Sequence, residues 1–228
     1  MENKTLYNNL QNILCEIKNG NDRGEKITLC GAIKTVDYQT VNLAAEYGLK
    51  VVAENKVQEF REKSPLLIGA EQQFIGHLQT NKVKYLIGKV SLIQSVDSIR
   101  LAEEIDRESL KKGVITNILA EINIGGELSK SGFDKFNAAE EIAKLKTLEN
   151  INLVGLMAML PKSDEENYLA DLCEETRALY DEFNKNNYRF TTLSMGMSAD
   201  YKIAIRHGSN MIRLGSAIFG KRNYEVEK

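Results

Sequence analysis

The chain has 228 residues, ordinary hydrophobic content for a globular protein and a net charge of −2. That length supports one sizeable core, and the near-neutral charge gives no electrostatic reason to expect binding to nucleic acid or to an anionic membrane surface. No apolar run is long enough to span a bilayer, and the first twenty residues are too polar for a signal peptide, so we expect a cytoplasmic protein.

The helix and strand pattern begins with an amphipathic helix over residues 4–18 and then alternates regularly. The strands are predicted at 27–33, 50–53, 73–75, 90–94, 115–124, 153–159, 191–194 and 211–214. The helices that follow them are predicted at 37–47, 54–63, 79–87, 98–111, 134–145, 163–186, 198–208 and 216–220. Gly48 is placed to end the second helix, Ser163 and Glu166 have capping-box spacing, and Ser198 fits an N-cap.

Eight strand–helix units in a chain of this length predict a (β/α)8 TIM barrel, preceded by one extra helix. A doubly wound open sheet is the alternative. It is less favoured, because no Gly-rich phosphate loop follows the first strand. No linker rich in Pro, Gly or Ser divides the chain, so we expect residues 1–228 to form a single domain.

The few cysteines and histidines argue against metal chemistry. Cys15, Cys30 and Cys173 are widely spaced, which disfavours a disulfide framework or a zinc site, and we expect each to pack as a small hydrophobe. His77 and His207 are the only histidines, so a multi-histidine metal site is not expected. His207 fits the end of a helix, whereas His77 fits a ligand-facing donor and a loop histidine equally well.

Lys34 is the most informative residue, because it follows a nearly unbroken apolar strand. Lysines are mostly exposed, and a solvated side chain is the default interpretation. In the partly desolvated mouth of a barrel, however, the charged form is disfavoured and the pKa falls. A neutral amine can attack an aldehyde, so Lys34 is a candidate nucleophile or Schiff-base former.

The last two strand ends fit a phosphate site. Barrels often bind phosphate in the loops after the seventh and eighth strands, and Ser194 and Gly215-Ser216 occupy those places. Each segment also fits a plain turn into a helix. Arg213 lies just before the end of the last strand and faces either a ligand or a structural partner. Asn55 and Met157 also fall at strand ends.

The motifs occur together in a recognisable order. They are AIKT (32–35), AENKVQE (53–59), FIGHLQTNK (74–82), SVD (95–97), the loop 123–133, GLMAM (155–159), SMGMS (194–198) and RLGSAIFG (213–220). The chain thereby resembles the pyridoxal 5′-phosphate (PLP) homeostasis proteins, the family usually called YggS or PROSC, over residues 27–220. Two departures are visible, since Ile33 stands where the family often has serine and Val36 where it often has lysine.

The resemblance implies a fold similar to the barrel domain of bacterial alanine racemase, with PLP as the cofactor. It implies that Lys34 carries PLP as an internal aldimine, that Ser194, Gly215 and Ser216 hold the phosphate, and that Arg213 faces the pyridine nitrogen. Asn55 would lie near the ring. A permanent cation beside that nitrogen disfavours its protonation, so we expect weak electron-sink chemistry.

Three functional hypotheses follow. The first is a non-catalytic protein that stores, buffers or delivers PLP, with PLP-dependent apoenzymes as partners and a monomer or weak dimer as the working form. The second is a weak PLP-dependent amino-acid racemase, disfavoured because we expect no second domain to supply an acid–base partner. The third is a regulatory protein that contacts a partner through the long polar loop at 123–133.

Overall fold

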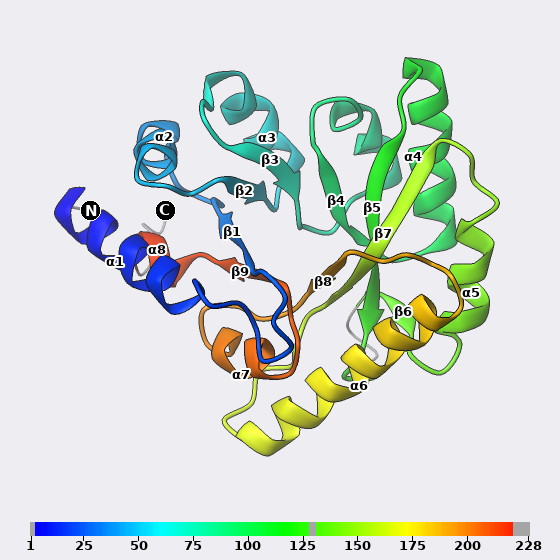
Figure 1. Cartoon of the computed structure of the whole chain (residues 1–228). Coiled ribbons are helices and arrows are strands. Elements are labelled where there is room, and N and C mark those ends of the chain that lie inside the picture. Colours follow the sequence, from blue (N-terminus) through cyan, green and yellow to red (C-terminus); the bar gives the residue numbers. More distant parts are fainter. Residues whose placement is uncertain (1–2, 128–130, 221–228) are drawn as a thin grey trace.

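The computed structural model describes residues 3–127 and 131–220 and shows a closed ring of parallel strands surrounded by helices (Figure 1). In order around the ring the strands are β1 (Thr28–Ala32), β2 (Val51–Glu54), β3 (Glu71–Phe74), β4 (Leu92–Val96), β5 (Thr116–Asn123), β7 (Ile151–Ala158), β8 (Thr192–Ser194) and β9 (Met211–Leu214). Pairing of β9 with β1 and of β4 with β5 closes the ring. The predicted TIM barrel is confirmed.

Helices connect successive strands on the outside of the barrel (Figure 1). They are α1 (Asn3–Glu16), α2 (Tyr38–Glu46), α3 (Val57–Lys63), α4 (Ile99–Lys112), α5 (Ala138–Leu145), α6 (Glu166–Lys185), α7 (Tyr201–Arg206) and α8 (Ser216–Phe219), with 3₁₀ helices η1 (Ser64–Leu66) and η2 (Thr80–Tyr85). The helix predicted over 79–87 is therefore a 3₁₀ segment. Its tighter turn is seen where the Lys82 N–H donates a hydrogen bond to the carbonyl oxygen of Gln79, three residues earlier. The two-residue strand β6 (Phe133–Asp134), which pairs with β5, was not predicted.

The core has two layers, because side chains alternate between the inside and the outside of each strand. The inner layer includes Cys30, Val51, Ala53, Leu92, Leu119, Met157 and Met211. The outer layer lies between the strands and the helices. Cys30 and Cys173 are buried as predicted, but Cys15 is exposed, because it falls on the face of α1 opposite its buried stripe.

The N-terminal helix α1 packs against α8, which begins at the barrel mouth. The predicted amphipathic helix is confirmed, since Leu6, Leu10 and Ile13 form a buried stripe along it. Asn9 Nδ2 donates a hydrogen bond to the carbonyl oxygen of Ile218 at 3.1 Å, which joins α1 to α8 (Figure 1). This contact supports α8, whose first residue belongs to the site described below.

Two predicted helix caps are wrong. The α6 helix begins at Glu166 with Glu165 as its N-cap residue, and the Ser163 hydroxyl accepts a hydrogen bond at 3.1 Å from the N–H of Glu165, a residue that precedes the helix. The α7 helix begins at Tyr201, so Ser198 lies in the loop before it and is free to bond elsewhere. The Gly48 prediction is confirmed, because that residue follows α2 with a φ of +113°, which favours glycine.

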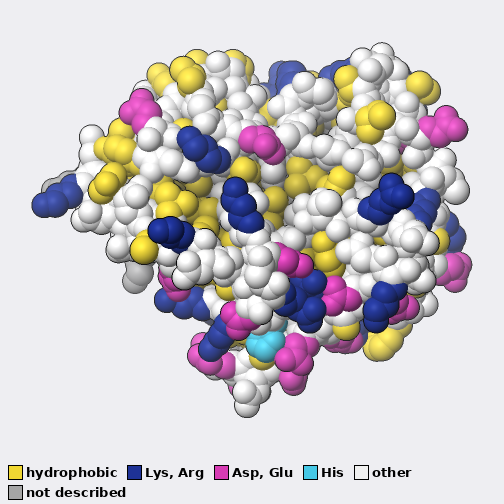
Figure 2. All heavy atoms as spheres, in the orientation of Figure 1, with side chains coloured by type: hydrophobic (Ala, Val, Ile, Leu, Met, Phe, Trp, Pro, Cys, Tyr) yellow, Lys and Arg dark blue, Asp and Glu magenta, His cyan; other side chains and the backbone are white. Residues whose placement is uncertain are grey.

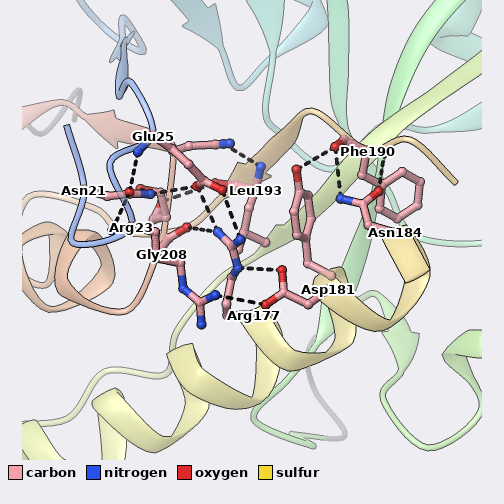
Figure 3. A network of polar contacts seen from close by, with 12 residues as sticks. Asn21, Arg23, Glu25, Arg177, Asp181, Asn184, Phe190, Leu193 and Gly208 are labelled. Carbon is pink, nitrogen blue, oxygen red and sulfur yellow. Dashed lines mark hydrogen bonds and ion pairs between the residues drawn. The ribbon is translucent and has the colours of Figure 1, made fainter. Parts of the chain in front are cut away.

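An ion-pair network closes the bottom of the barrel around Arg177 of α6 (Figure 3). Arg177 donates to both carboxylate oxygens of Glu25 at 2.8 and 3.0 Å, to Asp181 at 2.9 Å and to the carbonyl of Gly208 at 3.0 Å. Burial opposes the charge on Glu25, but hydrogen bonds from Arg177 and Asn21 hold the pKa of this carboxyl below its ordinary value. The network joins the loops before β1 and β9 to α6.

Part of one predicted functional loop lies outside the described residues. The loop at 123–133, expected to contact a partner, includes residues 128–130, which are the ones concerned. Across residues 3–127 and 131–220, none of the helices has the length and apolar character needed to cross a membrane.

Candidate functional site

The loops at the carboxyl ends of the strands enclose a hollow of about 510 Å³. Five of the seven predicted cofactor-binding residues line it, namely Lys34, Asn55, Arg213, Gly215 and Ser216. They come from the ends of three strands that are distant in sequence, and they meet because β1, β2 and β9 are neighbours in the ring. The face in Figure 2 shows hydrophobic side chains near its centre, with basic and acidic side chains intermingled below them over α6 and α7.

Lys34 lies in the turn that begins two residues after β1, and its side chain is partly buried. Ala32 and Ile75 line the hollow beside it and provide an apolar wall. Among the described residues its amine has neither a hydrogen-bond acceptor nor an ion-pair partner. The Lys34 amine is therefore free of partners within the described residues while its side chain lines the hollow.

Arg213 forms the polar floor of the hollow and is only 4% exposed. Its Nη1 donates to the Ser194 carbonyl at 2.9 Å and to the Ser194 hydroxyl at 2.6 Å, and its Nη2 donates to the Ala158 carbonyl at 2.9 Å. Burial lowers the pKa of the guanidinium from its usual range, although this group stays protonated in proteins. Of its five N–H groups, Nε–H and one at Nη2 have no acceptor among the described residues.

A chain of hydrogen bonds runs from this arginine through the barrel interior. The Ser194 hydroxyl donates to Gln94 Oε1 at 2.7 Å, Gln94 Nε2 donates to Gln73 Oε1 at 2.6 Å, and Gln73 Nε2 donates to Glu71 at 3.0 Å. Every donor points away from Arg213, so the chain begins at a cation and ends at a carboxylate. Aligned bonds of this kind reinforce one another at low dielectric.

The loops after β8 and β9 present backbone N–H groups to the hollow. The amides of Ser198, Ala199 and Ser216 have no acceptor among the described residues, and all three residues line the hollow. The Ser198 hydroxyl accepts hydrogen bonds from the N–H groups of Gly215 at 3.3 Å and Ala217 at 3.2 Å, which ties the two loops together. This arrangement is typical of an anion-binding concavity.

The turn that carries these amides depends on two local features. Gly196 has a φ of +94°, and a Cβ there would lie 2.8 Å from the Cβ of Ala204, so only glycine fits. Asp200 Oδ1 accepts from the Met197 N–H at 2.5 Å. Burial raises the pKa of the Asp200 carboxyl despite that hydrogen bond.

Two predicted site residues, Met157 and Ser194, do not line the hollow. Both are at most 1% exposed and lie one layer deeper in the barrel interior. Residues two apart on a strand face the same side, so Met159, which is 37% exposed, takes the position at the mouth above Met157. Applying this two-residue spacing from Met157 would have identified Met159 from the sequence.

Sequence reasoning assigned Ser198 to a helix cap and therefore missed its place in the hollow. Met197, which is 36% exposed, was missed in the same segment. His77 stands outside the lining and pairs with Asp97 at 3.1 Å. His207 is the C-cap residue of α7, as predicted, and pairs with Glu174.

Asn55 is brought to the hollow by a close approach between two loops. A Cβ on Gly76 would lie 1.9 Å from the carbonyl oxygen of Asn55, so the loop after β3 can pass this closely only with glycine there. The Asn55 N–H donates to Glu54 Oε2 at 3.0 Å. These contacts fix the Asn55 backbone at the rim of the hollow, which Asn55 lines together with Lys34.

Comparison with known proteins identifies the family. Residues 9–223 match the family described as alanine racemase, N-terminal domain. A pyridoxal phosphate homeostasis protein from Aquifex aeolicus is 40% identical over 206 residues, which cover 89% of this chain and 90% of that protein. The chain belongs to the pyridoxal phosphate homeostasis protein family.

Solved structures agree with this assignment. PipY of Synechococcus elongatus PCC7942, determined with PLP bound, superposes with a TM-score of 0.84 at 26% identity and covers 94% of this chain and 100% of its own. Alanine racemase of Clostridium difficile 630 superposes with a TM-score of 0.82 at 20% identity, and the match covers 97% of this chain but 58% of the racemase. The racemase likeness concerns the fold alone.

Proposed function

We propose that this family member binds PLP at the barrel mouth as a single domain, and that it stores, buffers or delivers the cofactor without strong catalytic activity of its own. One observation carries the proposal. The Lys34 amine, which has no partner among the described residues, shares a hollow with the Arg213 cation and with unpaired backbone N–H groups.

The donor set fits PLP in each of its functional groups. An amine suits an aldehyde, convergent backbone N–H groups suit a phosphate, and a guanidinium with two remaining N–H groups suits a ring nitrogen or oxygen. We assign Lys34 to the aldehyde, Ser198, Gly215 and Ser216 to the phosphate, and Arg213 to the pyridine nitrogen. Asn55 remains assigned to the vicinity of the ring.

Ser194 and Met157 take indirect roles in this proposal. The Ser194 hydroxyl and carbonyl already accept from Arg213, so Ser194 orients the guanidinium and the phosphate contact passes to Ser198. Met157 packs below the hollow and supports its floor. The sequence led us to expect that both residues contact the cofactor directly. In the structure each lies one layer of side chains below the hollow.

Reductive trapping tests the binding proposal. The protein is incubated with PLP, reduced with borohydride and mapped by mass spectrometry, and we expect a pyridoxyl group on Lys34. Lys34→Ala should abolish the label, whereas Lys82→Ala, which removes an exposed lysine of η2, should leave it unchanged. A label that persists in Lys34→Ala, or maps to another lysine, would refute the assignment.

The lining of the hollow favours storage over catalysis. Bound PLP supplies a reactive aldehyde and an electron-withdrawing ring. A racemase additionally needs acid–base groups on both sides of its substrate. Lys34 and Arg213 are the only titratable side chains among the residues that line the hollow in the described part of the chain. The Arg213 cation also disfavours positive charge on the ring nitrogen.

Two assays address this second part of the proposal. Chiral chromatography after incubation of the loaded protein with L-alanine should show no D-alanine above that produced by free PLP. Transfer is measured by mixing the loaded protein with a PLP-dependent apoenzyme and following the activity it gains. Racemisation well above background would favour the weak-racemase hypothesis instead.

A further inference from the structure

Two side chains of α3 hold the peptide groups on both sides of Lys34. Lys63 Nζ donates a hydrogen bond to the carbonyl oxygen of Ile33 at 2.9 Å, and Glu59 Oε2 accepts one from the N–H of Thr35 at 2.8 Å. The first bond is to the peptide group before Lys34 and the second is to the peptide group after it. The backbone of Lys34 is therefore held on each side by a charged side chain from another element.

The two α3 side chains belong to one partly buried cluster. Lys63 Nζ also bonds Glu59 Oε2 at 3.0 Å and Glu54 Oε1 at 2.5 Å, so all three of its N–H groups have acceptors. Burial raises the pKa of the Glu54 carboxyl, which is 1% exposed, although the Lys63 hydrogen bond opposes this shift. The other Glu54 oxygen accepts from the Asn55 N–H, which joins the cluster to a second loop of the hollow.

The turn adopts a backbone conformation that its own sequence does not favour. Thr35 has a φ of +65°, in the left-handed region that β-branched residues rarely adopt. In that conformation its N–H points to Glu59, and this hydrogen bond offsets part of the backbone strain. Without the acceptor, Thr35 is free to return to a negative φ, and this change would redirect the Lys34 side chain.

We propose that Glu59 and Lys63 are positioning residues for the Lys34 amine. Through the flanking peptide groups they keep Thr35 in the left-handed conformation and so aim Lys34 into the hollow. The inference rests on the proposed function of Lys34 in binding the PLP aldehyde. An i,i+4 Glu–Lys pair on a helix is ordinarily a weak surface contact, but here both side chains are mostly buried and face a functional turn.

The test compares two carboxylates of the same helix. Glu59→Met removes the acceptor for Thr35 and keeps the volume of the side chain. Glu62→Met removes the same charge from an exposed side chain, whose carboxylate accepts a hydrogen bond only from Gln58 among the described residues. We expect Glu59→Met to lower the borohydride-trapped fraction on Lys34 at limiting PLP, with an apparent affinity loss of about tenfold. Glu62→Met should match the parent.

A rescue variant separates positioning from general damage. Thr35→Gly permits a φ of +65° without steric cost, so Thr35→Gly combined with Glu59→Met should regain at least about threefold of the lost affinity. Urea midpoints are recorded for every variant. A structural role alone would lower the midpoint of Glu59→Met and would not be relieved by glycine at position 35.

The outcomes distinguish this inference from the function on which it rests. Lys34→Ala is measured in parallel, and a label that survives there overturns the proposed function. If Lys34→Ala loses the label while Glu59→Met and Glu62→Met trap PLP equally, only the positioning role is overturned. Failure of Thr35→Gly to restore trapping in the Glu59→Met background overturns it as well.

Discussion

The Arg177 network allows a matched test of how the barrel bottom is held together (Figure 3). Arg177 and Arg23 both pair with Asp181, but the Arg177 side chain is 8% exposed and the Arg23 side chain is 52% exposed. Replacing Arg177 with Met removes five N–H donors and leaves Glu25, Asp181 and the Gly208 carbonyl without them. Replacing Arg23 with Met removes one exposed ion pair.

The expected magnitudes differ because of burial. Breaking a buried pair by deleting one partner costs about 3–5 kcal/mol, and the partial exposure of Glu25 and Asp181 places Arg177→Met near the lower figure, about 3 kcal/mol. An exposed pair contributes about 0–1 kcal/mol, so Arg23→Met should be nearly neutral. With a urea m-value of about 3 kcal/mol/M, the two midpoints should fall by about 1 M and by less than about 0.3 M.

Acidification adds a second measurement on the same network. Because the folded-state pKa of Glu25 is lowered, its stabilising contribution is present above the unfolded-state pKa and is lost as the pH falls through the folded-state value. The difference in urea midpoint between the parent and Arg177→Met should therefore shrink from neutral pH to below the ordinary range of a glutamate carboxyl. Equal midpoints for Arg177→Met and Arg23→Met, or a difference that does not change with pH, would refute this reasoning.

Three further variants and modifications test other parts of the structure. Gly155→Ala would place a Cβ 1.7 Å from a backbone oxygen of β8, so we expect a loss above about 3 kcal/mol in urea unfolding, while Gly125→Ala, with no contact nearer than 3.7 Å, should be tolerated. Ser98→Ala removes the N-cap of α4 and should cost about 1 kcal/mol, and no change would show that this 3.4 Å bond is weak. In the folded protein a thiol reagent should modify exposed Cys15 and spare Cys30, where burial raises the pKa to about 12, and rapid labelling of Cys30 would contradict the packed interior.

The sequence by itself determined the barrel and most of its mouth. Apolar strands alternate with amphipathic helices, and the carboxyl ends of parallel strands meet at one rim, so Lys34, Asn55, Arg213 and Gly215 could be assigned to one site without coordinates. Local periodicity carries this information because it depends only on neighbours along the chain. The same reasoning missed β6, because a strand of two residues is too short to leave a periodic pattern.

Only the tertiary structure decided which layer of the barrel each side chain occupies and which distant groups it contacts. Ser194 lies too deep to reach the hollow, and the Ser198 hydroxyl bonds the start of α8 in place of capping α7. The hold of Glu59 on the Lys34 turn spans 24 residues, and that of Arg177 on Glu25 spans 152. Such partners are set by the arrangement of the strands around the ring, which brings together elements whose separation in sequence leaves no local signal.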